Sequence, residues 1–136
     1  MKLLLIYCSK FGYNPSIRTL ENADENVKAE DFENIQAAFI QAEEQDEENL
    51  KAVKTKLLKN IKWVCGKNNT RKVILHSFAH LSDSKASPEF TKSLFNETEE
   101  RLKNVDYEVS QTPFGYFLDL KIEAPGVSLA RVFKDF

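Results

Sequence analysis

The pattern of hydrophobic and polar residues predicts three strands in the first part of the chain. The nearly continuous apolar run Lys2–Cys8 is typical of a central strand covered on both faces. Apolar and polar positions alternate over Phe32–Ala42, which favours a half-buried strand, although the segment also has fair helix propensity. The run Val73–Leu75 predicts another buried strand. Ser9–Glu30 has no sustained period and predicts a loop with a short strand around Phe11–Ile17.

Two segments have the helical period. Apolar residues at spacings of three and four predict a helix from about Glu47 to Cys65, with Asp46 as its cap and Gly66 as its stop. Ser87-Pro88 predicts the start of a second helix, which ends near Asn104. The apolar faces of the two helices are formed by Leu50, Val53, Leu57, Ile61 and Val64, and by Leu94, Phe95, Thr98 and Leu102.

The last third of the chain predicts a hairpin and a closing helix. Val105–Ser110 and Tyr116–Glu123 alternate as strands do, and Thr112–Gly115 between them has the proline and glycine of a turn. The two strands are therefore expected to pair antiparallel. Val127–Phe136 predicts a short helix. Together these elements indicate an α/β fold, a mixed β-sheet packed with helices.

Length, charge and cysteine use limit the possible classes of protein. A chain of 136 residues with 42% hydrophobic residues fits a single domain, residues 1–136. A net charge of −2 excludes a basic footprint over the whole surface, so any contact with nucleic acid must be local. Cys8 and Cys65 have no metal-binding or redox spacing and are expected to be buried thiols. No apolar window approaches the length of a membrane span, and we expect a cytoplasmic protein.

The predicted first helix carries a stripe of lysines outside its apolar face. Such a stripe follows a phosphate backbone in some proteins, but it is more often a solvated helix face, and the sequence leaves both interpretations open. The stripe consists of Lys51, Lys54, Lys56, Lys59 and Lys62.

The segment Lys72–Pro88 runs from a buried strand through a polar loop into a helix. Strand ends in α/β sheets often collect ligands, because loop side chains and free helix N–H groups meet there. His80 lies in this loop and is a candidate for chemistry, although it could equally hydrogen-bond to loop carbonyls. His76 is expected to face a neighbouring strand or helix. A metal hydrolase built on His76 and His80 lacks further ligands at recognisable spacing.

Several runs of residues, in order along nearly the whole chain, carry a family resemblance. The chain resembles the N-terminal editing domain of archaeal threonyl-tRNA synthetases, a relative in fold of the D-aminoacyl-tRNA deacylases. The most specific runs are Phe78-Ala79-His80-Leu81-Ser82 and Pro113-Phe114-Gly115-Tyr116. The others are Leu4-Leu5-Ile6, Ala38-Phe39-Ile40 with Glu43, Asp46, Glu47 and Asn49, and Lys121-Ile122 with Gly126 and Leu129-Ala130.

The resemblance implies removal of serine wrongly attached to threonine tRNA, by ester hydrolysis assisted by the 2′-hydroxyl of the terminal adenosine. It implies His80 as the catalytic residue, contacts to tRNA from Lys85 and Lys121, and no cofactor or metal. The implied partners are the tRNA 3′ end, a threonyl-tRNA synthetase as partner or parent chain, and a second copy in a homodimer. The implied substrate-binding residues are Phe78, Ala79, Ser82, Pro113, Phe114, Gly115, Tyr116 and Phe117.

The chain departs from the family pattern at several polar positions. Phe117 replaces a tyrosine, Leu118 a lysine and Arg131 a glutamate, and Tyr7-Cys8-Ser9 replaces histidine-serine-aspartate. Hydrolysis needs donors for the oxyanion and a route for the proton. Two hypotheses therefore stand. One is a working deacylase built on His80, nearby backbone groups and Ser82 or Lys121. The other is a catalytically silent module that binds the tRNA 3′ end or a synthetase.

Overall fold

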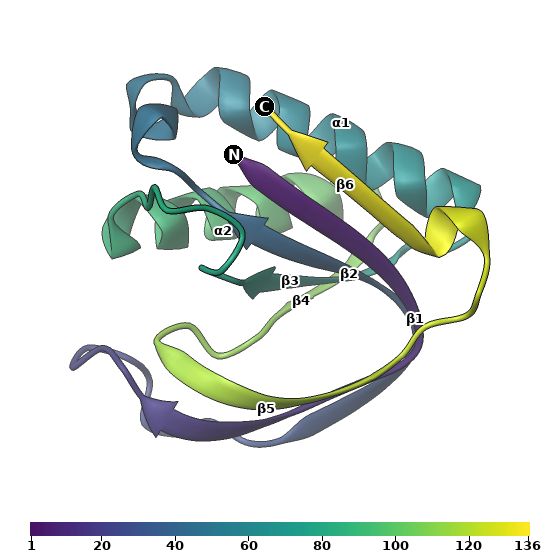
Figure 1. Cartoon of the computed structure of the whole chain (residues 1–136), viewed down its shortest axis with the longest axis horizontal. Helices are drawn as coiled ribbons and strands as arrows, with labels where there is room; N and C mark the ends of the chain where they lie inside the picture. The colour runs from purple at the N-terminus through teal and green to yellow at the C-terminus, as the bar shows by residue number, and fades with distance from the viewer.

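The structure is a computed structural model that describes residues 1–136, and it confirms a mixed sheet packed with helices. Six strands form one sheet in the order β4-β3-β2-β1-β5, with β6 also paired to β1. Figure 1 shows both long helices on the same face of this sheet. The elements are β1 (Lys2–Arg18), β2 (Glu30–Gln41), η1 (Glu44–Glu48), α1 (Leu50–Lys67), β3 (Lys72–Ser77), α2 (Pro88–Lys103), β4 (Glu108–Gln111), β5 (Tyr116–Glu123), η2 (Ser128–Ala130) and β6 (Arg131–Asp135).

Strand β1 holds the sheet together. It is 17 residues long, because the predicted first strand and the predicted short strand around Phe11–Ile17 are continuous. Along one edge it pairs antiparallel with β2. Along the other edge it pairs with β6 in its first part and with β5 in its second part. Figure 1 shows that β1 curves, so that β5 lies across from β2 and β3 rather than beside them.

The curved sheet has a core on each side. The larger core lies between the sheet and the helices and contains Leu57, Ile61 and Leu94. The smaller core lies on the concave side, where Phe11 and Phe39 pack with partly buried Leu118 and Leu120. β2 is buried on both faces from Ile35 to Gln41, so this strand is more deeply buried than the predicted half-buried strand.

Both cysteines are buried and free, as predicted. Cys8 belongs to the smaller core and Cys65 to the larger one. Burial raises the pKa of the Cys8 thiol to about 11 and that of Cys65 to about 12. Since the thiolate is the reactive form, both thiols are chemically inert at neutral pH.

Two predictions about the last third of the chain are wrong. β4 does not form a hairpin with β5, because β4 pairs parallel with β3 whereas β5 pairs antiparallel with β1. The closing segment is not a helix: after the short η2 it forms β6, which pairs with the start of β1. Val132 of this strand packs against the larger core, a contact that the alternating pattern of a strand provides.

The ends of α1 also differ from the prediction. The helix is capped by Asn49, whose side chain accepts a hydrogen bond from the Ala52 N–H, and not by Asp46. Asp46 accepts instead from the Glu43 N–H at 2.7 Å, which ties it to the preceding segment. Gly66 lies inside the helix, which continues to Lys67.

Helix α2 begins as predicted, with the Ser87 hydroxyl accepting from the Phe90 N–H and Pro88 in the first turn. Neither α1 nor α2 is long and apolar enough to cross a membrane.

Candidate functional site

One cavity of about 420 Å³ opens where the curved sheet brings distant segments together. Its wall includes the residues Phe78–His80, which follow β3, and the residues Pro113–Phe117, which form the turn before β5 and the first two residues of that strand. Thr19 and Leu20 at the end of β1 and Pro88 and Thr91 of α2 complete other parts of the wall. The two most specific runs of the sequence therefore meet at one cavity, with His80 and Tyr116 both in its wall.

His76 lies in this wall near the end of β3 and is buried. Its Nδ1 is 2.9 Å from the hydroxyl oxygen of Thr112, and its ring contacts the rings of Phe39 and Phe78 at centroid distances of 5.1 and 5.8 Å. Burial lowers the pKa of His76 to about 4, so the ring is neutral at pH 7. Sequence reasoning placed His76 against a neighbouring element; its place in the cavity wall was missed.

His80 occupies an exposed turn directly after Phe78 and Ala79. The ring of His80 packs edge-on against Phe78 at a centroid distance of 4.9 Å. A second, shallower depression beside the cavity is lined by Ala79, His80, Ser82 and Lys85. His80 thus borders both spaces, Lys85 does the same, and Ser82 faces only the second.

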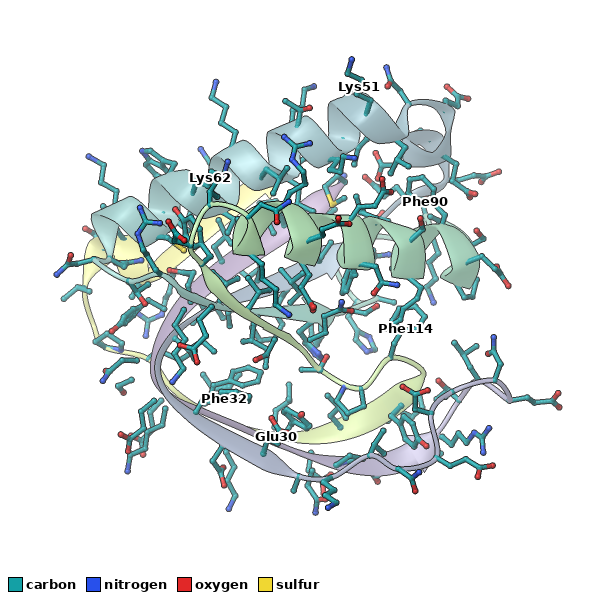
Figure 2. All side chains as sticks on the ribbon, turned by 180° about the vertical axis from the view of Figure 1, so that it is seen from behind. Glu30, Phe32, Lys51, Lys62, Phe90 and Phe114 are labelled. Atoms are coloured by element: carbon teal, nitrogen blue, oxygen red, sulfur yellow. The ribbon has the colours of Figure 1, made fainter.

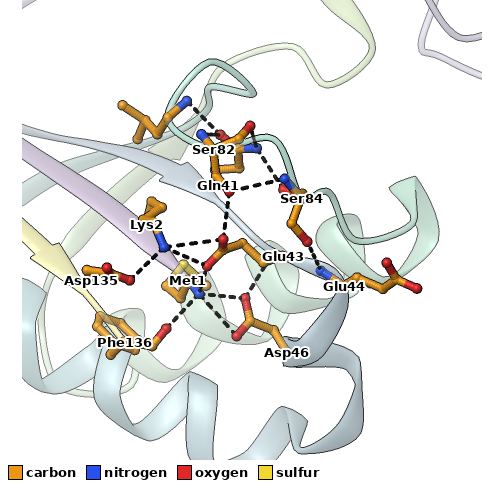
Figure 3. Close-up of polar contacts among 11 residues, drawn as sticks. Met1, Lys2, Gln41, Glu43, Glu44, Asp46, Ser82, Ser84, Asp135 and Phe136 are labelled. Carbon is orange, nitrogen blue, oxygen red and sulfur yellow. Dashed lines mark hydrogen bonds and ion pairs between the residues drawn. The ribbon is translucent and has the colours of Figure 1, made fainter.

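The turn that carries His80 is fixed from below by Gln41, the last residue of β2 (Figure 3). The Gln41 side-chain oxygen accepts from the Leu81 and Ser82 amides at 2.6 and 2.8 Å. Its nitrogen donates to the Ser82 and Ser84 carbonyls at 2.7 and 2.8 Å. All the hydrogen-bonding capacity of this buried amide is directed at one loop, so Gln41 acts as a brace.

Glu43 connects the same loop to the start of the chain (Figure 3). Its carboxylate accepts from the Ser82 hydroxyl at 2.6 Å, from the Met1 ammonium at 2.6 Å and from Lys2 Nζ at 3.2 Å. Burial by itself would raise the pKa of Glu43. The hydrogen bonds from the Met1 ammonium, Ser82 and Lys2 outweigh burial and lower the pKa to about 2. The carboxylate is therefore ionised at neutral pH.

The opposite wall is held by Gly115 and Tyr116. Gly115 has a φ of 87°, and a Cβ atom there would lie only 2.9 Å from the Ala23 Cβ. The Gly115 carbonyl accepts from the Thr19 N–H at 2.7 Å, and the Tyr116 hydroxyl donates to the Asp24 carbonyl at 2.5 Å. Glycine is needed for both the backbone conformation and the close approach.

Two of the departures from the family pattern lie in the cavity wall. Leu118 is half-buried and also packs against the smaller core. Phe117 also lines the cavity, but this residue is 59% exposed to solvent. The residues Tyr7-Cys8-Ser9 and Arg131 do not line the cavity, and neither does Lys121, which is exposed on β5. Lys121 therefore does not replace the missing lysine in this wall.

The structure contains no group of three or more histidine, cysteine, aspartate or glutamate side chains that could hold a metal ion. Sequence reasoning missed Thr19, Leu20, Gln41 and Thr112, which all line the wall. Gln41 carried one usable signal, since it is a polar residue at the end of an otherwise apolar run.

Comparison with known proteins identifies the family. Residues 1–136 match the family described as the archaea-specific editing domain of threonyl-tRNA synthetase. The threonine–tRNA ligase of Thermococcus sibiricus is 32% identical over 135 residues, which are 97% of this chain and 22% of that protein. The ligase of Methanopyrus kandleri is 28% identical, over 97% of this chain and 21% of its own length.

The chain thus spans about a fifth of the length of these relatives. A solved structure named c-Myc DNA Unwinding Element Binding Protein has the same fold over 100% of this chain and 99% of its own. Its TM-score is 0.69 and its sequence identity only 10%. The match of the family model over residues 1–136 shows that the chain belongs to the family of archaea-specific editing domains of threonyl-tRNA synthetase.

Proposed function

We propose that this domain hydrolyses the ester that joins serine to mischarged threonine tRNA. The observation that carries the proposal is the meeting of Phe78–His80 and Pro113–Phe117 in one cavity, in a chain of the editing-domain family. In this proposal the seryl group and the terminal adenosine of the tRNA enter the cavity, while His80 and Lys85 stand at its border.

Hydrolysis of the ester requires a water molecule and stabilisation of the oxyanion that forms at the carbonyl oxygen. Water adds to the ester carbonyl carbon, the bond to the ribose oxygen breaks, and that oxygen takes up a proton, which gives free serine and an unacylated tRNA. The neighbouring 2′-hydroxyl of the adenosine positions or activates the water. The protein then needs to supply mainly oriented hydrogen-bond donors.

The backbone amides of Ala79 and His80 fit the role of donors. In the turn after β3, the Phe78 N–H donates to the Ile40 carbonyl, and the Leu81 and Ser82 amides donate to Gln41. The Ala79 and His80 amides make no hydrogen bond within the protein, and both residues line the cavity. We assign these two N–H groups to the oxyanion and the His80 ring to a hydrogen bond with the substrate at the cavity mouth.

A second candidate function rests on Leu118. This residue places an apolar side chain in the cavity wall where the family pattern has a lysine. A silent module that binds the tRNA 3′ end without hydrolysis would need the cavity but not the lysine. The retained turn and the unpaired amides favour the deacylase.

Hydrolysis of seryl-tRNA carrying the threonine anticodon tests the proposal. The unchanged protein is expected to release serine, and His80→Ala to reduce the rate at least about tenfold. Glu100→Ala, at an exposed position on α2, serves as the control and should leave the rate unchanged. A protein that binds this tRNA but releases no serine would support the silent module instead.

Assembly and location belong to the same proposal. We infer that the domain acts in the cytoplasm, within or beside a threonyl-tRNA synthetase, and as a homodimer. Light scattering on the purified domain measures the number of copies, and a mass of one chain at micromolar concentration would refute the homodimer.

A further inference from the structure

The solvent face of α1 has a charge unlike that of the rest of the chain. Six of the 18 residues of this helix are lysines and none is acidic. The helix therefore carries a formal charge of +6 in a chain of net charge −2, and the remaining residues carry −8. Figure 2 shows Lys51 and Lys62 on α1, on the side of the molecule away from β5.

Most of these lysines are free of acidic partners. The one salt bridge of an α1 lysine joins Lys54 to Glu97 of α2 at 3.1 Å. The others form, together with one residue of β6, what we call the α1 basic face: Lys51, Lys56, Lys59, Lys62, Lys67 and Lys134. Lys51 and Lys67 lie more than four turns apart, so the face extends for about 24 Å along the helix.

An exposed tryptophan lies within this face. Trp63 is 40% exposed, and the ammonium of Lys134 lies 5.2 Å from the centre of its ring. This cation–π contact holds a lysine of β6 beside those of the helix. Acidic residues gather in η1, before the first turn of α1, so the positive charge is most concentrated toward the C-terminal half of the helix.

We propose that the α1 basic face binds the phosphate backbone of the tRNA body while the 3′ end occupies the cavity. No residue of α1 lines the cavity, so the two contacts are separate parts of the surface. A row of lysines without interspersed acids matches the charge of a phosphate backbone. A protein partner fits less well, because lysine is depleted at protein–protein interfaces and Trp63 is the single exposed large apolar residue of this helix. The inference deepens the proposed function and rests on it for the identity of the RNA.

The test measures binding of unacylated threonine tRNA by fluorescence anisotropy over a range of salt concentrations. The triple variant Lys56→Gln, Lys59→Gln, Lys67→Gln removes three exposed charges, and glutamine keeps good helix propensity. We expect its Kd to rise at least about tenfold near 0.1 M salt. The slope of log K against log salt is expected to shrink by about 2 to 3, because each lysine neutralises about one phosphate.

The matched control is Lys28→Gln, Arg101→Gln, Lys103→Gln, which changes the net charge equally at exposed positions off α1. Its Kd should change less than about twofold. Equal losses in both variants, or no tRNA binding by the unchanged protein, would overturn the inference. So would a triple variant that keeps tRNA binding but loses binding to the remaining domains of a synthetase. Circular dichroism checks that α1 stays folded in the variant.

A short substrate separates this inference from the proposed function. A seryl ester of a CCA trinucleotide reaches the cavity but lacks the tRNA body, so the triple variant should hydrolyse it at the rate of the unchanged protein. Loss of tRNA binding in a protein that hydrolyses neither substrate would support the basic face while refuting the deacylase. A large drop in trinucleotide hydrolysis in the triple variant would count against two separate contacts.

Discussion

Glu43 joins the start of the chain to the loop after β3 through one buried carboxylate, which accepts from Met1, Lys2 and Ser82. Its pKa of about 2 in the folded protein lies below its ordinary value of 4.5. The unfolded chain therefore binds more protons between these values. The stabilisation from this carboxylate is fully present above about pH 4.5 and is lost as the pH falls toward 2.

We expect Glu43→Gln to lower the free energy of unfolding by about 1–3 kcal/mol at pH 7, because it leaves the Met1 ammonium with a weaker partner. The variant should also lose less stability than the unchanged protein on acidification. Urea unfolding at several pH values measures both effects. Glu100→Gln, at an exposed position, should change neither, and a pH dependence identical in Glu43→Gln and the unchanged protein would contradict the assignment.

Leu118 stands in the cavity wall where the family pattern has a lysine, so restoring that lysine tests its contribution. We expect Leu118→Lys to increase the hydrolysis of seryl-tRNA at least about tenfold, because an ammonium in the wall can stabilise the developing oxyanion. The same change should lower stability by about 1–3 kcal/mol, since Leu118 also packs against the smaller core. Phe117→Lys is the control, because that side chain is 59% exposed. An equal gain from both lysines would point to general attraction of the tRNA.

The site could be predicted from the sequence only in part. The segments Phe78–Ser82 and Pro113–Phe117 were found as short runs of specific residues, and the structure brings most of them to one cavity. The contact of His76 with Thr112 was not predictable, because Thr112 directly follows β4, and the sequence does not reveal that β4 pairs with β3. The role of Gln41 was hidden for the same reason: its four hydrogen bonds reach residues 40 or more positions away.

At the scale of elements, the loop after β3 depends on β2 for its shape. We expect Gln41→Leu to increase amide exchange at Leu81 and Ser82 and to reduce serine release several-fold, since both amides would lose their acceptor. Hydrogen exchange followed by NMR reads the first effect directly. Gln45→Leu, at an exposed position in η1, should leave both unchanged. Unaltered exchange at both amides in Gln41→Leu would show that Gln41 does not brace the turn.

Alternation and helical period identified most elements correctly but not their partners. The strand Tyr116–Glu123 has the predicted bounds, yet it pairs with β1. Alternation reports which face of a strand is buried, whereas pairing depends on how the whole sheet curves. The segment Arg131–Asp135 alternates over only five residues, too few to distinguish a strand from a helix turn by period alone. The cap of α1 was misplaced because the Asp46 carboxylate accepts instead from the distant Met1 ammonium and from the Glu43 N–H at the start of η1.

At the scale of the whole molecule, the proposed function makes the cavity the part that selects the substrate. Its volume of about 420 Å³ has to hold an amino acid and part of an adenosine. We expect seryl-tRNA to be hydrolysed at least about tenfold faster than threonyl-tRNA, because a filled pocket can exclude an added methyl group by crowding. A pocket that instead preferred the larger threonyl group would gain only about 1–3 kcal/mol of binding free energy from the added methyl. Parallel rate measurements on both esters decide this, and equal rates would indicate a general deacylase.

The pairing of β1 also governs when the domain can fold during synthesis. Strand β1 leaves the ribosome first, and its partners β2, β5 and β6 are synthesised later, in that order. The last partner, β6, pairs its residues Arg131–Asp135 with Lys2–Ile6. Contacts of such large sequence separation form slowly, and no shorter nascent chain can complete the sheet. Until Asp135 emerges, the edge of β1 that receives β6 stays unpaired, so the nascent domain has a period in which a chaperone or a neighbouring chain can bind that edge.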